Sequence, residues 1–73
     1  MTDLAEAERR VPEVNARIDG QRQIVDELAA EGYDITSAQI ILDSLFITLF
    51  LSVEERHRLR RALDSASPEA RAA

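Results

Sequence analysis

The residue best suited to take part in a chemical reaction is His57, which lies among arginines in the segment EERHRLRR, residues 54–61. A histidine on a helix can act as a nucleophile that accepts a phosphoryl group and passes it on. Such a site needs small residues and a lysine around the histidine, whereas here the neighbours are arginines. The favoured interpretation is therefore a histidine at the boundary of a solvated helix face, and phosphotransfer stays an alternative.

The second candidate is a cluster of four arginines in the same segment: Arg56, Arg58, Arg60 and Arg61. They could form an anion patch, and the RNA-binding hairpin dimer Rop is an architectural precedent, although architecture alone is only analogy. Cations are also favoured at a helix C-terminus. In an antiparallel hairpin the arginines would face acidic residues near the N-terminus. With 14 acidic residues, 9 basic ones and a net charge of −5, the chain argues against general nucleic-acid binding.

Other reactive groupings are absent from the sequence. There is no cysteine and one histidine, so neither a thiolate zinc site nor a histidine cluster can form. Asp43, Ser44 and Thr48 make a small polar group, but hydroxyls within a helix usually bond back to a backbone carbonyl one turn earlier. We therefore expect no catalytic residues, no cofactor and no metal, and we expect that the protein is not an enzyme.

The elements that position these residues are two helices. The first, over about 3–31, has a heptad pattern in which every seventh position and a second position between them are apolar. These positions are Leu4, Val11, Ile18 and Val25, and Ala7, Val14, Gln21 and Leu28. Gln21 is the one polar residue among them, and we hypothesise that it sets the register. Asp3 with Glu6 is placed to cap the start. Pro12 either kinks this helix or begins it after a separate turn.

Gly32 marks the turn, over 32–36, because a glycine after a helix adopts the left-handed conformation that ends it. Thr36 and Gln39 have the spacing of a capping box, which predicts the start of the second helix. That helix covers about 37–65, and residues 66–73 are expected to form a disordered tail. The predicted contacts across the hairpin include Leu28 with Ile41 and Leu4 with Leu63. The predicted seam of the second helix is Ala38, Leu42, Leu45, Leu49, Ser52, Arg56, Leu59 and Leu63.

Ser52 and Glu55 have the spacing of another capping box. The second helix could therefore break at Ser52 and restart there. Because the seam continues in register through this point, one continuous helix is favoured.

The segment IILDSLFITLFL, residues 40–51, carries more apolar surface than one partner helix can cover. One helix covers a stripe of about 100°. Leu42, Leu45 and Leu49 fill that stripe. The remaining large side chains are expected to pack against another molecule: Ile40, Phe46, Ile47, Phe50 and Leu51. The predicted fold is therefore all-α, an antiparallel two-helix hairpin (residues 1–65) that dimerises into a four-helix bundle. The alternative is a monomer that binds an unidentified protein through this face.

The same run bears on location. Twelve residues are fewer than the roughly 20 that span a bilayer, and the N-terminus lacks the pattern of a secretory signal. We therefore expect a cytoplasmic protein without a membrane span. Association of the run with a membrane surface would favour basic residues on both flanks, which the chain lacks.

The central region, about residues 17–60, resembles a group of small bacterial helical-hairpin proteins without assigned activity. The resemblance is carried by a pattern in which Gln-Arg, two aliphatics and a leucine precede Gly-x-Asp and an alanine-led second helix. Its residues are Gln21, Arg22, Ile24, Val25, Leu28, Gly32, Asp34, Ala38, Leu42, Leu45 and Leu49. The resemblance implies the hairpin and implies no activity. Relatives in this group tend to have polar residues where this chain has Phe46 and Ile47, which favours a tighter oligomer.

The resulting functional expectation is a non-catalytic interaction module, an adaptor or regulator, that acts as a homo-oligomer. A signalling module of the phosphotransfer or response-regulator-binding type is the first alternative, and an RNA-binding hairpin dimer is the second.

Overall fold

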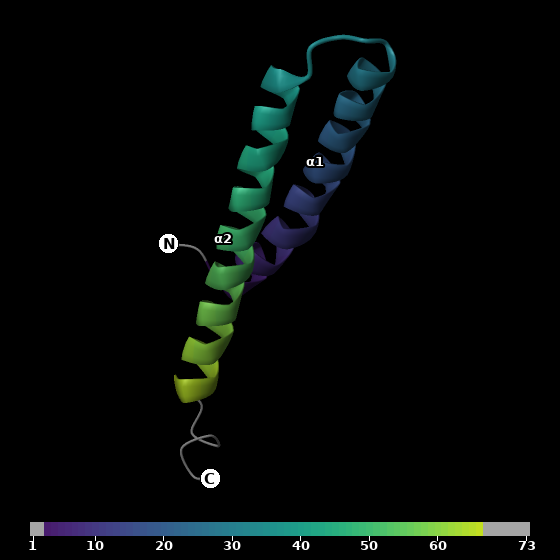
Figure 1. Cartoon of the computed structure of the whole chain (residues 1–73). Helices are drawn as coiled ribbons and strands as arrows, with labels where there is room; N and C mark the ends of the chain where they lie inside the picture. Colours follow the sequence, from purple (N-terminus) through teal and green to yellow (C-terminus); the bar gives the residue numbers. More distant parts are fainter. Residues whose placement is uncertain (1–2, 67–73) are drawn as a thin grey trace.

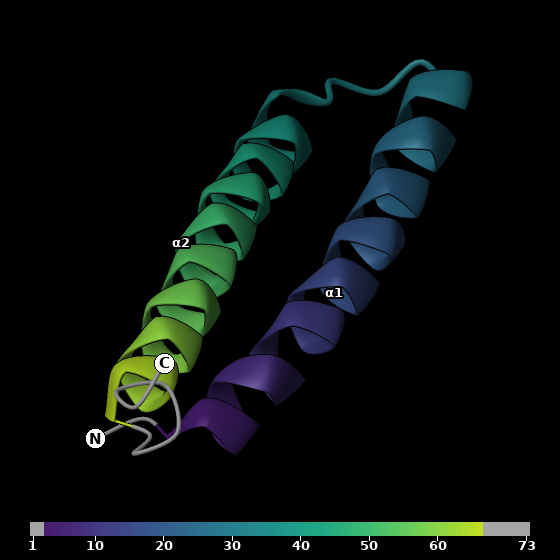
Figure 2. The same ribbon diagram turned by 90° about the horizontal axis from the view of Figure 1, so that it is seen from below.

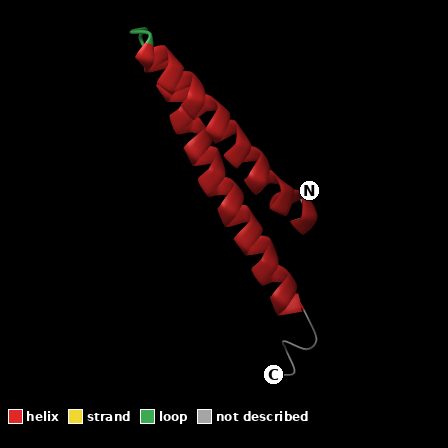
Figure 3. Ribbon diagram, turned by 90° about the vertical axis from the view of Figure 1, so that its right-hand side faces the viewer, coloured by secondary structure: helices red, strands yellow, loops and turns green. Residues whose placement is uncertain are grey.

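The protein folds as two antiparallel helices joined by a short turn (Figure 1). A computed structural model describes residues 3–66, in which α1 covers Leu4–Ala30 and α2 covers Thr36–Ala66. Between these two helices the described chain has only a short loop and no strand (Figure 3). The predicted helical hairpin is confirmed. Residue 66, predicted as the start of the tail, ends α2, and residues 67–73 lie outside the described part of the chain.

α1 begins where the sequence predicts. The Asp3 carboxylate Oδ1 accepts a hydrogen bond of 2.8 Å from the Glu6 amide, which satisfies one of the free N–H groups of the first turn. The helix then continues through Pro12, so the alternative in which Pro12 begins the helix is wrong. The proline ring removes the hydrogen bond that the Glu8 carbonyl would otherwise accept.

α1 ends in a Schellman motif, which explains why the turn needs a glycine. Gly32 has φ +81°, and its amide donates to the Ala29 carbonyl at 3.1 Å, while the Tyr33 amide donates to the Leu28 carbonyl at 2.9 Å. This pair of bonds satisfies the last carbonyls of the helix and requires a left-handed residue at position 32.

We expect Gly32→Ala to lower the free energy of unfolding by about 1–2 kcal/mol, because a side chain is strained in the left-handed region. Gly20 is the matched control: it lies within α1 and a Cβ there would meet no atom within 4 Å. Gly20→Ala should instead stabilise the protein by roughly 0.5–1 kcal/mol through backbone entropy. Thermal unfolding of the two variants at equal concentration checks this, and equal shifts would contradict the role of Gly32.

The start of α2 differs from the predicted capping box. The Thr36 hydroxyl and amide both donate to Asp34 Oδ1, at 2.6 and 2.9 Å. The Gln39 amide donates to the Ile35 carbonyl at 2.8 Å, and its side chain donates to Asp43 Oδ1 at 3.0 Å. The capping residue is therefore Asp34, two residues before the predicted one, because its carboxylate accepts both Thr36 groups at once.

α2 is continuous through Ser52, so the alternative break at this residue is wrong. The Ser52 hydroxyl donates to the Thr48 carbonyl at 2.8 Å, Thr48 to Ser44 at 3.0 Å, and Ser44 to Ile40 at 3.0 Å. These bonds confirm the expected back-bonding of hydroxyls and extend it by one turn. Each hydroxyl satisfies its donor within the helix, so none of them caps a new one.

The core lies between the helices, along most of the predicted seam. Val14, Ile18 and Val25 of α1 are buried against Leu42 of α2. Partly buried residues packed against this cluster are Ile35, Ala38, Leu45 and Leu49. Figure 2 shows the two helices running side by side with opposite chain directions. Two residues of the predicted contacts across the hairpin, Ile41 beside the turn and Leu63 at the open end, are more than half exposed. Leu63 still lines a hollow together with Leu4, its predicted partner.

Candidate interaction surface

The most prominent surface feature is a set of large apolar side chains on the side of α2 that faces away from α1. Ile40, Ile47, Phe50 and Leu51 keep between 59% and 64% of their surface exposed. With Phe46 at 38%, these are the five residues that the sequence analysis assigns to a partner interface. We call them the outer apolar face.

The position of this face follows from the helical period. At about 100° per residue, Ile47 lies roughly 200° around the helix from Leu45. α1 packs on the side of Leu45 and Leu49, so one helix cannot reach Ile47 as well. α1 is different in character, because Ile24 is the one large apolar residue of this helix that is exposed.

Phe46 lies at the margin of the outer apolar face, next to α1. The guanidinium carbon of Arg22 lies 5.4 Å from the centre of the Phe46 ring, a cation–π distance. Arg22 therefore covers part of the ring within one chain, which explains why Phe46 is the least exposed of the five. This contact is not predictable from the sequence, since neither residue alone indicates its partner.

Gln21 takes a polar role in the seam. Its side-chain amide donates to the Ala38 carbonyl of α2 at 3.0 Å. This bond fixes the position of one helix along the other, as expected of a residue that sets register. The register role itself stays a hypothesis.

The four arginines of the possible anion patch do not gather on one side of α2. Arg60 pairs with Glu8 of α1 at 3.0 Å, as the charge pattern predicts, and Arg56 is half-buried near the seam. Arg58 and Arg61 are exposed, and neither makes an ion pair within residues 3–66. The cluster in the sequence thus becomes one ion pair across the hairpin, one half-buried arginine and two outward charges.

His57 lies on an exposed part of α2, one turn after Val53. Within the described residues no group of three or more metal-ligating side chains converges there or elsewhere. No hydrogen bond or ion pair holds His57 in place in this part of the chain. The geometry gives it no partner for general acid–base work.

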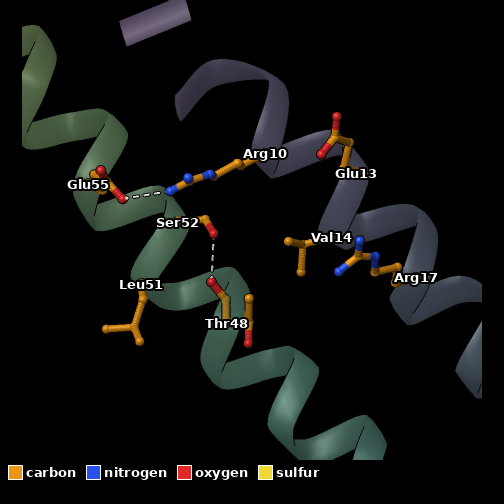
Figure 4. A pocket seen from close by; sticks show the side chains of 8 residues that line it. All are labelled: Arg10, Glu13, Val14, Arg17, Thr48, Leu51, Ser52 and Glu55. Carbon is orange, nitrogen blue, oxygen red and sulfur yellow. Dashed lines mark hydrogen bonds and ion pairs between the residues drawn. The ribbon is translucent and has the colours of Figure 1, made fainter. Parts of the chain in front are cut away.

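A groove of about 400 Å³ runs between the helices on one flank (Figure 4). Arg10 spans it to reach Glu55, with 3.4 Å between the charged atoms. The charged side chains that line the groove are two arginines and two glutamates, so the groove has no net charge that would select an ion. It is lined by Arg10, Glu13, Val14, Arg17, Thr48, Leu51, Ser52 and Glu55.

The turn carries a carboxylate with a displaced pKa. The hydrogen bond from the Thr36 hydroxyl, supported by the Thr36 amide, lowers the pKa of Asp34 below its ordinary value. Both bonds end on Oδ1, and Oδ2 accepts no hydrogen bond from any described residue. Asp34 therefore presents a charged, free oxygen at the start of α2.

α2 also bears on the expectation that no segment can cross a membrane. That expectation rests on the length of the run 40–51, which is twelve residues. Over 18 residues α2 has a mean hydropathy of 1.6 with at most two charged residues, and 17% of that stretch is buried in the hairpin. By length and composition alone, α2 could cross a bilayer. Core helices of soluble proteins can have the same length and composition.

Comparisons with protein-family models, with curated proteins and with solved structures found no match for this chain. The resemblance to small bacterial helical-hairpin proteins is thus untested and stays a prediction.

Proposed function

We propose that this protein is a non-catalytic helical interaction module that acts as a homodimer in the cytoplasm. In the dimer, the outer apolar face of one hairpin is covered by that of a second copy. The observation that carries this proposal is the exposure of Ile40, Ile47, Phe50 and Leu51 on the side of α2 that α1 does not cover.

Free energy favours covering this face. Full burial of one large apolar side chain contributes roughly 1.5–3 kcal/mol, and each of these four keeps more than half of its surface for a partner. Contiguous apolar patches of this kind on a monomer usually mark an interaction site. The four helices of two hairpins would then lie side by side, rather than around one common core as in the four-helix bundle expected from the sequence.

A second copy fits this face because the face is apolar, convex and confined to one helix. Two identical faces related by a two-fold axis bury the same residues on both sides, which is the commonest arrangement of soluble dimers. The polar outer side of α1 then remains in solvent and is the surface available to other partners.

The test is the mass of the wild-type protein in solution, measured by sedimentation across a hundredfold range of concentration. We expect twice the chain mass of 8.2 kDa throughout most of that range. A mass of one chain at the highest concentration would contradict the proposal. The outer apolar face would then be the binding surface for a different protein.

Insertion of α2 into a bilayer is the second candidate, favoured by the apolar 18-residue stretch of that helix. Against it stands Asp43 within the run 40–51, since a carboxylate costs about 2.5–3.5 kcal/mol near the centre of a spanning helix. Flotation with neutral phosphatidylcholine vesicles separates the two. We expect the protein to stay at the bottom of the gradient, and quantitative flotation that resists high salt would favour the membrane.

A further inference from the structure

We propose that the two α2 helices pack against each other in antiparallel directions, about a two-fold axis near residues 45 and 46. Arg58 of each chain then pairs with Asp34 of the second copy. α1 of each chain lies on the outside, so that the four helices form a layer with the α2 pair at its centre. This inference rests on the proposed dimer.

The apolar residues give the first estimate of the axis. In an antiparallel pair related by a two-fold axis, the sequence numbers of any two residues that face each other add up to the same value. Half of that value is the position of the axis. The outer apolar face extends from Ile40 to Leu51, so its midpoint falls between 45 and 46. With that axis Ile40 of one chain lies opposite Leu51 of the other, and Ile47 lies closest to the axis.

The charges give the same axis independently. Arg58 follows Ile40 by 18 residues, about five helical turns, and therefore lies on the same side of α2. It has no ion-pair partner within residues 3–66. Asp34 lies in the turn just before α2 and has the free Oδ2 described above. The midpoint of 34 and 58 is 46, which agrees with the apolar midpoint to within about one residue of helix length.

Glu54 fits the same arrangement. It lies about 180° around the helix from Leu45 and so on the outer side of α2. With the axis at 45–46 it faces residues 37–38 of the second copy, at the start of the other α2. A carboxylate is stabilised near a helix N-terminus by the helix dipole.

A parallel pair is disfavoured by the same charges. In register, it would place Asp43 against Asp43 of the second copy and Glu54 against Glu54, because both residues lie on the outer side. Like charges at an interface oppose association. The antiparallel pair separates the two Glu54 positions by about 25 Å along the helix and the two Asp43 positions by about 8 Å.

A charge reversal tests the ion pair. Arg58→Glu should raise the dissociation constant about two- to thirtyfold, since two symmetric surface pairs are lost. Arg9→Glu makes the same change in net charge on α1, where Arg9 has no ion pair among the described residues, and should change the constant less than twofold. Equal weakening of the dimer by both variants would contradict the proposed ion pair between Arg58 and Asp34.

Cysteine cross-linking tests the direction of packing, because the wild-type sequence contains no cysteine. Ile47→Cys should form a disulfide with its own copy under mild oxidation with diamide, since the two positions lie within about 5 Å along the helix axis. Ile40→Cys alone and Leu51→Cys alone should not, because each is about 16 Å from its own copy along the axis and a disulfide needs Cα atoms within about 7 Å. A mixture of these two variants should give the mixed dimer.

Three results would overturn the inference. Self-linked Ile40→Cys and Leu51→Cys at the rate of Ile47→Cys would show a parallel pair. A dimeric mass with no cross-link at any of the three positions would keep the proposed dimer and place its interface elsewhere. A monomeric mass of the wild type would end both the inference and the proposed function.

Discussion

Replacing Ile47 with glutamate is expected to convert the dimer into a monomeric, folded hairpin. Ile47 is 63% exposed in the single chain and would lie near the two-fold axis, so the substitution brings two carboxylates together in an apolar interface. A desolvated, unpaired charge costs several kcal/mol, and each 1.4 kcal/mol is tenfold in affinity. The dissociation constant should therefore rise by about a hundredfold or more, as measured by sedimentation of the variant.

The matched control is Ala16→Glu, which adds the same charge at an exposed alanine of α1. It should leave the mass at two chains. Helix content from circular dichroism should be preserved for Ile47→Glu at low temperature, since the core of the hairpin does not include this residue. An unchanged dimeric mass of Ile47→Glu would show that the outer apolar face is not the contact between copies.

The hairpin seam could be read from the sequence because it depends on local periodicity. Apolar residues that recur at heptad spacing lie on one side of a helix, and the burial of Val14, Ile18 and Val25 follows that spacing. The pattern is weaker at the ends. Leu63 has the right spacing and lines a hollow together with Leu4, but it is more than half exposed at the open end of the hairpin.

The polar contacts were harder to predict, because several side chains compete for the same groups. Thr36 and Gln39 have the spacing of a capping box, yet Asp34 takes the Thr36 hydroxyl and amide. A carboxylate is the stronger acceptor because bonds to charged groups exceed neutral ones. The Arg22 contact with Phe46 depends on the angle between the helices, which a one-dimensional pattern does not contain.

The candidate interface was predictable for a simpler reason. A helix in a two-helix hairpin can bury one stripe, and the run 40–51 contains apolar residues on two opposite sides. The surplus side was therefore identifiable from the sequence, whereas its occupant was not. The free Oδ2 of Asp34 emerges only from the structure, and together with the outward position of Arg58 it carries the inference of an antiparallel second copy.

Ile18→Ala should destabilise the protein more than any other single truncation in α1. Ile18 is 4% exposed and packs in the central core cluster, and removing such a side chain leaves a cavity that costs about 2–5 kcal/mol. A chain of this size has a total stability on the order of 4–11 kcal/mol. The variant should therefore lose a large part of its free energy of unfolding, measured by urea denaturation.

Ile24→Ala is the matched control, with the same side chain removed from the same helix at a position that is 47% exposed. It should cost about 1 kcal/mol or less, because exposed substitutions rarely create a cavity. Both variants must be compared with the wild type at one protein concentration, since a dimer gains stability as concentration rises. Equal losses from the two truncations would mean that Ile24 is also buried in solution. The partner would then contact α1 in addition to α2, and the layered dimer, with α1 on the outside, would be wrong.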